Sequence, residues 1–199
     1  MTQTTATPTA TATATATGVT AGLRSLHLIR VVFSLLWVAL VLTTSGSLDS
    51  TDRLSVTAAV LLVVYPLWDV VATLLERRLA GTTDRVSTVN MGLGLCATAA
   101  MGIAGFSTVG TALVVFGVWA LLSGAVQLVV AVRRRRAVGA QWPMVVSGGQ
   151  SVLAGATIAA TAASPTSTLS TVAGYSAFGA FWFLVSVIAL SIRGRRAER

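Results

Sequence analysis

The chain has 199 residues, of which 54% are hydrophobic and 10% are charged, and its mean hydropathy is +0.82. An ordinary soluble domain carries about 25% charged residues. A water-soluble enzyme or a disordered protein is therefore excluded by composition, and the single cysteine, Cys96, cannot form an internal disulfide. The composition indicates an integral membrane protein that crosses the bilayer several times.

The net charge of +8 comes from arginine alone, because the chain contains no lysine. The arginines lie singly or in short clusters between apolar runs, where they set membrane orientation and meet anionic headgroups. We therefore expect contacts with the lipid bilayer and its anionic headgroups, and no nucleic acid as a partner. The sequence leaves open a homo-oligomer or an unidentified membrane-protein partner.

Taken in chain order, residues 1–22 alternate alanine with threonine, without charge or apolar periodicity, and predict a disordered tail. Residues 23–199 then predict an all-α integral membrane domain with six transmembrane helices, each near the 20 residues that a 30 Å hydrocarbon core requires. The expected spans are 26–44, 54–75, 86–106, 109–132, 142–162 and 169–192.

Arginine counts at the joints predict the orientation. Thirteen arginines fall on one side of the predicted membrane and only Arg53 falls on the other. Under the positive-inside rule, both termini then lie in the cytoplasm of a bacterial cell, with the chain in the plasma (inner) membrane. The topology anchors, which are also candidate anionic-lipid contacts, are Arg77, Arg78, Arg133, Arg134, Arg135, Arg136, Arg193, Arg195 and Arg196.

The first span has an alternative interpretation. Arg24 and Arg30, the apolar run 31–42 and the small residues 43–47 also fit a signal peptide. The long preceding tail and the lack of an A-x-A cleavage pattern favour a retained helix. The other five spans keep their topology in either case.

An internal repeat is visible in the arginine clusters. Those that begin at Arg77, Arg133 and Arg193 each follow an even-numbered span, at separations of 56 and 60 residues. This spacing predicts three helical hairpins that start and end on the same side, and therefore parallel repeats around an axis along the membrane normal.

Small residues predict where helices approach closely, because packing in lipid depends on backbone contact. The fifth span has small residues at a strict spacing of four: Ser147, Ser151, Gly155, Ala159 and Ala163. The third span has a shorter run of the same kind. We expect both helices to lie inside the bundle.

Asp69 is the main candidate for function, since an ionisable side chain within a span is costly. Arg30 lies at a comparable depth in the first span. The two residues form either a structural ion pair or part of a proton or cation pathway. The polar residues Asn90, Gln127 and Gln150 fall in the same half of the membrane, and they predict either interhelical hydrogen bonds or the lining of an inward-facing vestibule.

No catalytic, metal or cofactor motif is present. The chain has a single histidine, His27, and a single cysteine, so a Cys/His ligand set or dyad is excluded. No glycine-rich phosphate loop follows a predicted strand. We expect no cofactor, no metal site and no catalytic residues, and hence a protein that is not an enzyme.

The segments VFGVWALLSGAVQLVVAVRRRR and QWPMVVSGGQSVLAG, with a last helix ending in SIRGRR, resemble the HdeD-like family of small bacterial inner-membrane proteins. The resemblance covers about residues 25–196, and YPLWDVVATLLERR looks like an actinobacterial branch. It implies a six-helix inner-membrane protein of unknown function, from a family whose founding member is linked to acid stress, with no catalytic residues to carry over.

Two functions follow as hypotheses. The first is a non-enzymatic membrane protein of stress response or envelope maintenance, for which Asp69 would be paired and inaccessible. The alternative is a small transporter or proton/cation pathway that uses Asp69. A cavity that reaches Asp69 from the cytoplasm would favour the alternative.

Overall fold

The computed structural model describes residues 9–44, 53–81, 83–138, 142–164 and 167–197. It contains six helices in this order: α1 (Thr9–Thr44), α2 (Val56–Ala80), α3 (Arg85–Ala104), α4 (Val109–Val138), α5 (Trp142–Thr161) and α6 (Ser170–Ala197). The predicted all-helical architecture with six helices is confirmed. The predicted spans agree with these bounds to within a few residues, apart from the extended start of α1 and the longer ends of α2, α4 and α6.

Five of the six helices are long and apolar enough to cross a membrane, which supports the prediction of a membrane protein. The apolar stretch of α5 is shorter, at Val145–Thr161. Large apolar side chains such as Val56, Leu153 and Phe106 lie on the outer surface, at 82%, 72% and 90% exposure. In lipid such a surface is solvated by acyl chains and requires no partner protein.

The start of α1 differs from the prediction. The helix begins at Thr9 and therefore includes residues 9–22, which the sequence predicts to be a disordered tail. The physical reason is that alanine has the highest helix propensity, so an alanine-rich segment can continue an adjoining apolar helix upstream. The first eight residues lie outside the described part.

The joint between α2 and α3 is defined by local capping. α2 ends at Gly81, whose positive φ of 63° forms a left-handed cap that favours glycine. Asp84 then caps α3, since its Oδ1 accepts a hydrogen bond from the backbone N–H of Ser87 at 2.7 Å. These two caps reverse the chain within a short joint.

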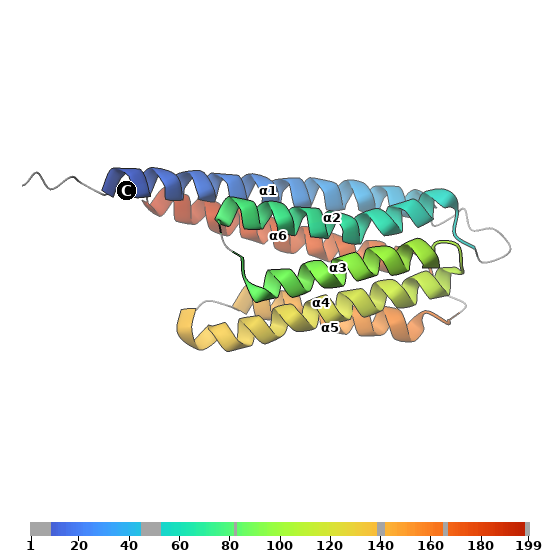
Figure 1. The fold of residues 1–199 in the computed structure, drawn as a ribbon. Helices are drawn as coiled ribbons and strands as arrows, with labels where there is room; N and C mark the ends of the chain where they lie inside the picture. The colour runs from blue at the N-terminus through green and yellow to red at the C-terminus, as the bar shows by residue number, and fades with distance from the viewer. Residues whose placement is uncertain (1–8, 45–52, 82, 139–141, 165–166, 198–199) are drawn as a thin grey trace, which may run out of the picture.

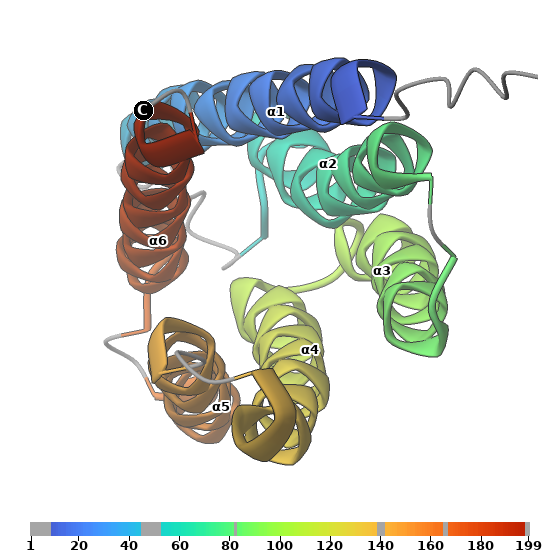
Figure 2. The ribbon, with the colours of Figure 1, turned by 90° about the vertical axis from the view of Figure 1, so that its left-hand side faces the viewer.

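The helices form a ring in chain order, with α6 closing against α1 (Figures 1 and 2). None of the six described helices occupies the centre, so the prediction that the third and fifth spans lie inside the bundle is wrong. The packing alternates around the ring. The pairs α2 with α3, α4 with α5, and α6 with α1 pack more extensively than the two helices of any predicted hairpin. Figure 2 shows α5 and α6 widely separated at the end that faces the viewer, and of the neighbouring pairs they share the least contact.

The tightest pair is α4 with α5, and the small residues predicted for α5 account for it. A Cβ atom on Gly155 would lie 2.4 Å from the backbone nitrogen of Leu121, and one on Gly117 would lie 2.6 Å from that of Ala159. A Cβ atom on Gly124 would likewise lie 2.6 Å from the Cβ atom of Ser151. Contacts this close exist only because the side chains are absent, which confirms close packing along this stripe.

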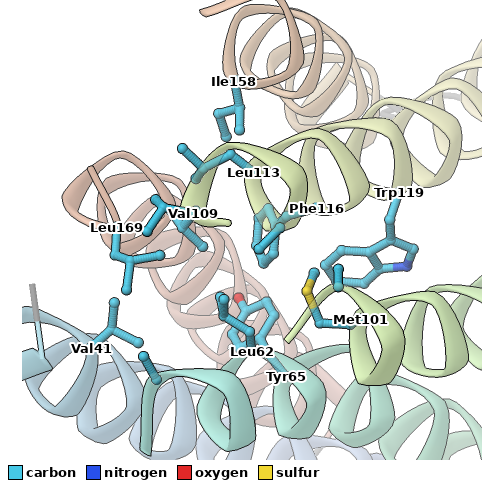
Figure 3. Packing of buried hydrophobic residues seen from close by; sticks show 14 of the residues in the cluster. Val41, Leu62, Tyr65, Met101, Val109, Leu113, Phe116, Trp119, Ile158 and Leu169 are labelled. Atoms are coloured by element: carbon cyan, nitrogen blue, oxygen red, sulfur yellow. The ribbon is translucent and has the colours of Figure 1, made fainter. Parts of the chain in front are cut away.

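The hydrophobic core fills one half of the ring. It takes residues from the ends of α1, α3 and α5 and from the starts of α2 and α4, together with residues 169–173 at the start of α6. Phe116 at its centre is fully buried, with Leu62, Met101 and Leu113 around it (Figure 3). At the same end, a backbone bridge joins Arg53 to Thr108. The half opposite the core, where α2, α4 and α6 end, is called the arginine-bearing end below.

Candidate functional site

A cavity of about 730 Å³ occupies the arginine-bearing half of the ring. All six helices line it, and its wall extends to Asp84 and Val86 at the α2–α3 joint. Tyr65 and Trp119 belong both to this wall and to the hydrophobic core, so they mark the boundary between the two halves. The interior is therefore hollow and polar on one side and packed on the other.

Arg30 of α1 lies in the wall of this cavity between two carboxylates of α2. Its Nη1 is 3.8 Å from Oδ1 of Asp69, and its Nη2 is 3.5 Å from Oε2 of Glu76. The Arg30 side chain is 9% exposed, whereas those of Asp69 and Glu76 are 26% and 42% exposed. The expected Arg30–Asp69 pair thus forms, but Asp69 keeps a surface toward the cavity.

The remaining polar candidates are distributed unevenly. The side-chain amide of Asn90 on α3 donates to Oδ2 of Asp69 at 3.4 Å, which places it in the same cluster. Gln127 on α4 lines the cavity. Gln150 on α5 instead accepts a hydrogen bond from the indole nitrogen of Trp182 on α6, at 2.9 Å. Asn90 and Gln127 therefore line the cavity, while Asn90 and Gln150 also form hydrogen bonds between helices.

His27 also lies in the wall, near the cytoplasmic end predicted for α1. One ring nitrogen, Nδ1, is 2.7 Å from the carbonyl oxygen of Leu23 one turn earlier. Its ring packs edge-on against Phe183, with 6.0 Å between centroids. The first contact lies within α1, and the second joins α1 to α6.

Among the arginines predicted as topology anchors, Arg77 lines the cavity, with its Nη1 3.0 Å from the sulfur of Met91. Arg78 follows it at the end of α2. The side chains of the arginines at 133–136 and at 193, 195 and 196 lie outside the described part.

Six aromatic side chains line the cavity, and sequence reasoning did not single out most of them. They are Tyr65, Trp68, Trp119, Tyr175, Trp182 and Phe183. Tyr65 packs edge-on against Trp119 with 6.0 Å between centroids, and Phe116 joins both of them to Tyr175 from the core side. The floor of the cavity is thus aromatic.

Glu76 is a charged neighbour of Arg30 that the sequence analysis missed. The signal that could have found it is its spacing from Asp69, because seven residues are two helical turns and place both carboxylates on one face of α2. The adjacent arginines at 77 and 78 instead suggested an interfacial helix end.

Within the described residues, no group of three or more His, Cys, Asp or Glu side chains could hold a metal ion. Cys96 is a free, exposed thiol. What the arrangement can do is bind, because it offers carboxylates, guanidinium groups, amides and aromatic faces around one cavity.

A model described as "Short repeat of unknown function (DUF308)", the family to which HdeD-like proteins belong, matches residues 86–160. The matched segment spans α3, α4 and α5 almost completely. No curated protein and no solved structure matches the chain.

Proposed function

We propose that this protein is a small membrane transporter that takes a cationic solute or a proton into a cavity open to the cytoplasm, with Asp69 as its anionic centre. The observation that carries the proposal is the cavity itself, which reaches Asp69 on one side and is backed by the hydrophobic core on the other. A cavity open at one end and sealed at the other is the geometry of one state of an alternating-access carrier.

The charges that line the cavity favour a cation. Asp69, Glu76 and Asp84 contribute three carboxylates, whereas Arg30 and Arg77 contribute two guanidinium groups. The described wall therefore carries one excess negative charge, and a cation entering it gains attraction while an anion meets repulsion. Stress response or envelope maintenance, the other hypothesis, is implied by the HdeD-like resemblance alone, and the accessible surface of Asp69 disfavours a purely structural role.

The proposal also covers the orientation of the helices in the membrane and the threefold repeat of helical hairpins. The arginine-bearing end faces the cytoplasm of a bacterial inner membrane, both termini lie there, and α5 completes the sixth crossing. Three hairpins repeat in parallel around the cavity. The alternation of tight and loose packing around the ring supports this symmetry, as does the description of the matched family as a short repeat. Polar residues also stand 60 positions apart in the three odd-numbered helices, at Arg30, Asn90 and Gln150.

The protein is proposed to be non-enzymatic, acting without a cofactor. Its partners are the bilayer and its anionic headgroups, which the arginines at the helix ends contact. The membership of the whole chain in the HdeD-like family, in an actinobacterial branch, is part of the same proposal.

Flux measurements test the transporter function. The full chain is reconstituted into proteoliposomes, and uptake of radiolabelled tetramethylammonium and dye-reported proton movement are followed under an imposed membrane potential. We expect at least one flux to exceed that of protein-free liposomes and to be lost in Asp69→Asn. Cys96→Ser is the control, because this exposed thiol does not line the cavity. Flux that is absent, or unchanged in Asp69→Asn, would overturn the proposal.

A further inference from the structure

The surroundings of Arg30 have the features of a binding site for an organic cation. Two carboxylates of α2 face the guanidinium from one side, and its Cζ lies 5.0 Å from the centre of the Phe183 ring on α6. Carboxylates combined with an aromatic face are the groups with which proteins hold delocalised cations. The chain thus fills its own cation site with one of its own side chains.

Arg30 is held there incompletely. Its distances to the carboxylates, 3.8 and 3.5 Å, lie beyond or at the limit of hydrogen bonding, and neither pair has the short parallel contacts of a bidentate bridge. Among the described residues, its buried Nε has no hydrogen-bond partner. A guanidinium bound this loosely can leave at a lower cost than one in a fully bonded bridge.

The cavity beside Arg30 has room for a replacement. Its aromatic floor, formed by Tyr65, Trp119 and Tyr175, lines the same cavity as Asp69 and Glu76. A flat solute with one delocalised positive charge and an apolar substituent could place its charge between the carboxylates and its substituent on the aromatic rings. The volume of about 730 Å³ is also within the range of sites for small organic molecules.

We propose that Arg30 is a tethered stand-in for the substrate, and that the substrate is a planar organic cation of the guanidinium type. The solute displaces the Arg30 guanidinium from between Asp69 and Glu76 and takes over both carboxylates and the aromatic wall. The displaced side chain turns toward the open end of the cavity, where water hydrates its charge and lipid phosphates can pair with it. The empty site is thereby kept neutralised, and each binding event exchanges one cation for another. This inference rests on the proposed transporter function and names its substrate class.

Binding of phenylguanidinium to the full-length protein in nanodiscs, measured by isothermal titration calorimetry, tests the inference. Phenylurea serves as the matched ligand control, because it has nearly the same shape and no charge. In Arg30→Met the competing guanidinium is removed and the volume is roughly kept, so we expect binding about tenfold tighter than in the wild type. In Asp69→Asn and in Glu76→Gln we expect binding about tenfold weaker.

The direction in which Arg30→Met changes the affinity for phenylguanidinium shows whether Arg30 competes with the substrate or only stabilises the fold. If Arg30 only stabilised the fold, its removal would lower affinity or leave it unchanged, and either result in a folded protein overturns the inference. Equal binding of phenylurea and phenylguanidinium overturns it as well. Where Arg30→Met cannot be purified, Arg30→Lys replaces it. The lysine side chain lacks the planar guanidinium that contacts Phe183, so it competes less well for the site. The Arg30→Lys variant should therefore bind phenylguanidinium more tightly than the wild type, and an unchanged or lower affinity contradicts the proposal.

The two proposals fail separately. Asp69-dependent flux of tetramethylammonium or protons without phenylguanidinium binding would leave the transporter intact and remove the substrate class. Phenylguanidinium binding that tightens in Arg30→Met, without flux of any probe, would retain the exchange site and remove the transport function.

Discussion

The indole N–H of Trp182 on α6 donates to the side-chain oxygen of Gln150 on α5 at 2.9 Å, across the neighbouring pair of helices that shares the least contact in the ring. A second polar link, from the hydroxyl of Tyr175 to that of Ser151 at 3.3 Å, crosses the same interface. Where packing is sparse, two hydrogen bonds carry a larger part of the association.

We therefore expect a measurable coupling between Trp182 and Gln150. A double-mutant cycle of Trp182→Phe and Gln150→Leu, followed by denaturant unfolding in mixed micelles, should give about 0.6 kcal/mol, the usual value for such bonds in membrane proteins. Ser191→Ala is the control, because that hydroxyl donates to the backbone carbonyl of Val187 in its own helix, at 2.8 Å. A coupling of zero would mean that the bond adds nothing to α5–α6 association.

The α4–α5 contact should be intolerant of added side-chain atoms. In Gly155→Ala the new Cβ would meet backbone atoms of Leu121 and Gly117 at 2.4 and 2.6 Å, so the helices must separate. We expect a loss of about 1–3 kcal/mol, measured as a lower thermal unfolding midpoint in detergent. Gly149→Ala, six residues earlier, meets nothing within 4 Å and should be neutral or stabilising by up to about 1 kcal/mol. Equal effects at the two positions would contradict the packing described.

Phe116 should seal the cavity from the opposite side of the membrane. It is fully buried between the aromatic floor and the apolar core. Phe116→Ala should cost about 3–5 kcal/mol of stability and raise the passive leak of protons through proteoliposomes. Phe106→Ala removes a side chain that is 90% exposed and should change neither quantity. If proteoliposomes with Phe116→Ala leak protons no faster than those with the wild type, residues other than Phe116 seal the cavity.

Solvent access to the cavity can be measured by cysteine labelling. In a Cys96→Ala background, Ser147→Cys places a thiol in the cavity wall, whereas Ser176→Cys makes the same substitution at a fully buried position of α6. A charged, membrane-impermeant thiosulfonate added from the arginine-bearing side should modify the first and spare the second. Similar labelling of both would indicate that the bundle opens more widely than described.

Orientation is open to direct test. Fluorescent-protein fusions after positions 81 and 139 should fluoresce, because these joints are proposed to be cytoplasmic, while alkaline phosphatase fusions after 107 and 165 should be active. Replacement of the four arginines at 133–136 by glutamine should reduce this asymmetry, since arginine at short loops sets topology. Phosphatase activity at position 139 in the unaltered chain would invert the proposed orientation.

Much of the fold could be predicted because its determinants are local. Helix formation in long apolar runs and the small residues of α5 both depend on neighbouring positions in one helix. Five of the helices are long and apolar enough to cross a membrane, and the small residues of α5 pack closely against α4. The start of α1 at Thr9 was missed because the absence of apolar periodicity was given more weight than the helix propensity of alanine.

The candidate site was predicted only in part. Asp69 and Arg30 stand out in the sequence because each is a charge within an apolar run, and pairing them required only comparable depth. Trp119 and Tyr175 do not stand out, since aromatic residues in a membrane helix usually belong to the core or to the interface. Their place on the cavity floor depends on the rotation of each helix about its own axis.

By itself, the sequence determined that the chain prefers lipid, that it forms six helices, and that its charges gather toward one end, because hydropathy and charge depend on residue type and order alone. Only the tertiary structure decided that the helices form a ring instead of a filled bundle, and that Glu76 and Phe183 converge on Arg30. These relationships arise from contacts between residues far apart along the chain, such as Arg30 and Phe183, which are separated by 153 positions. No local pattern encodes which faces will meet across such distances.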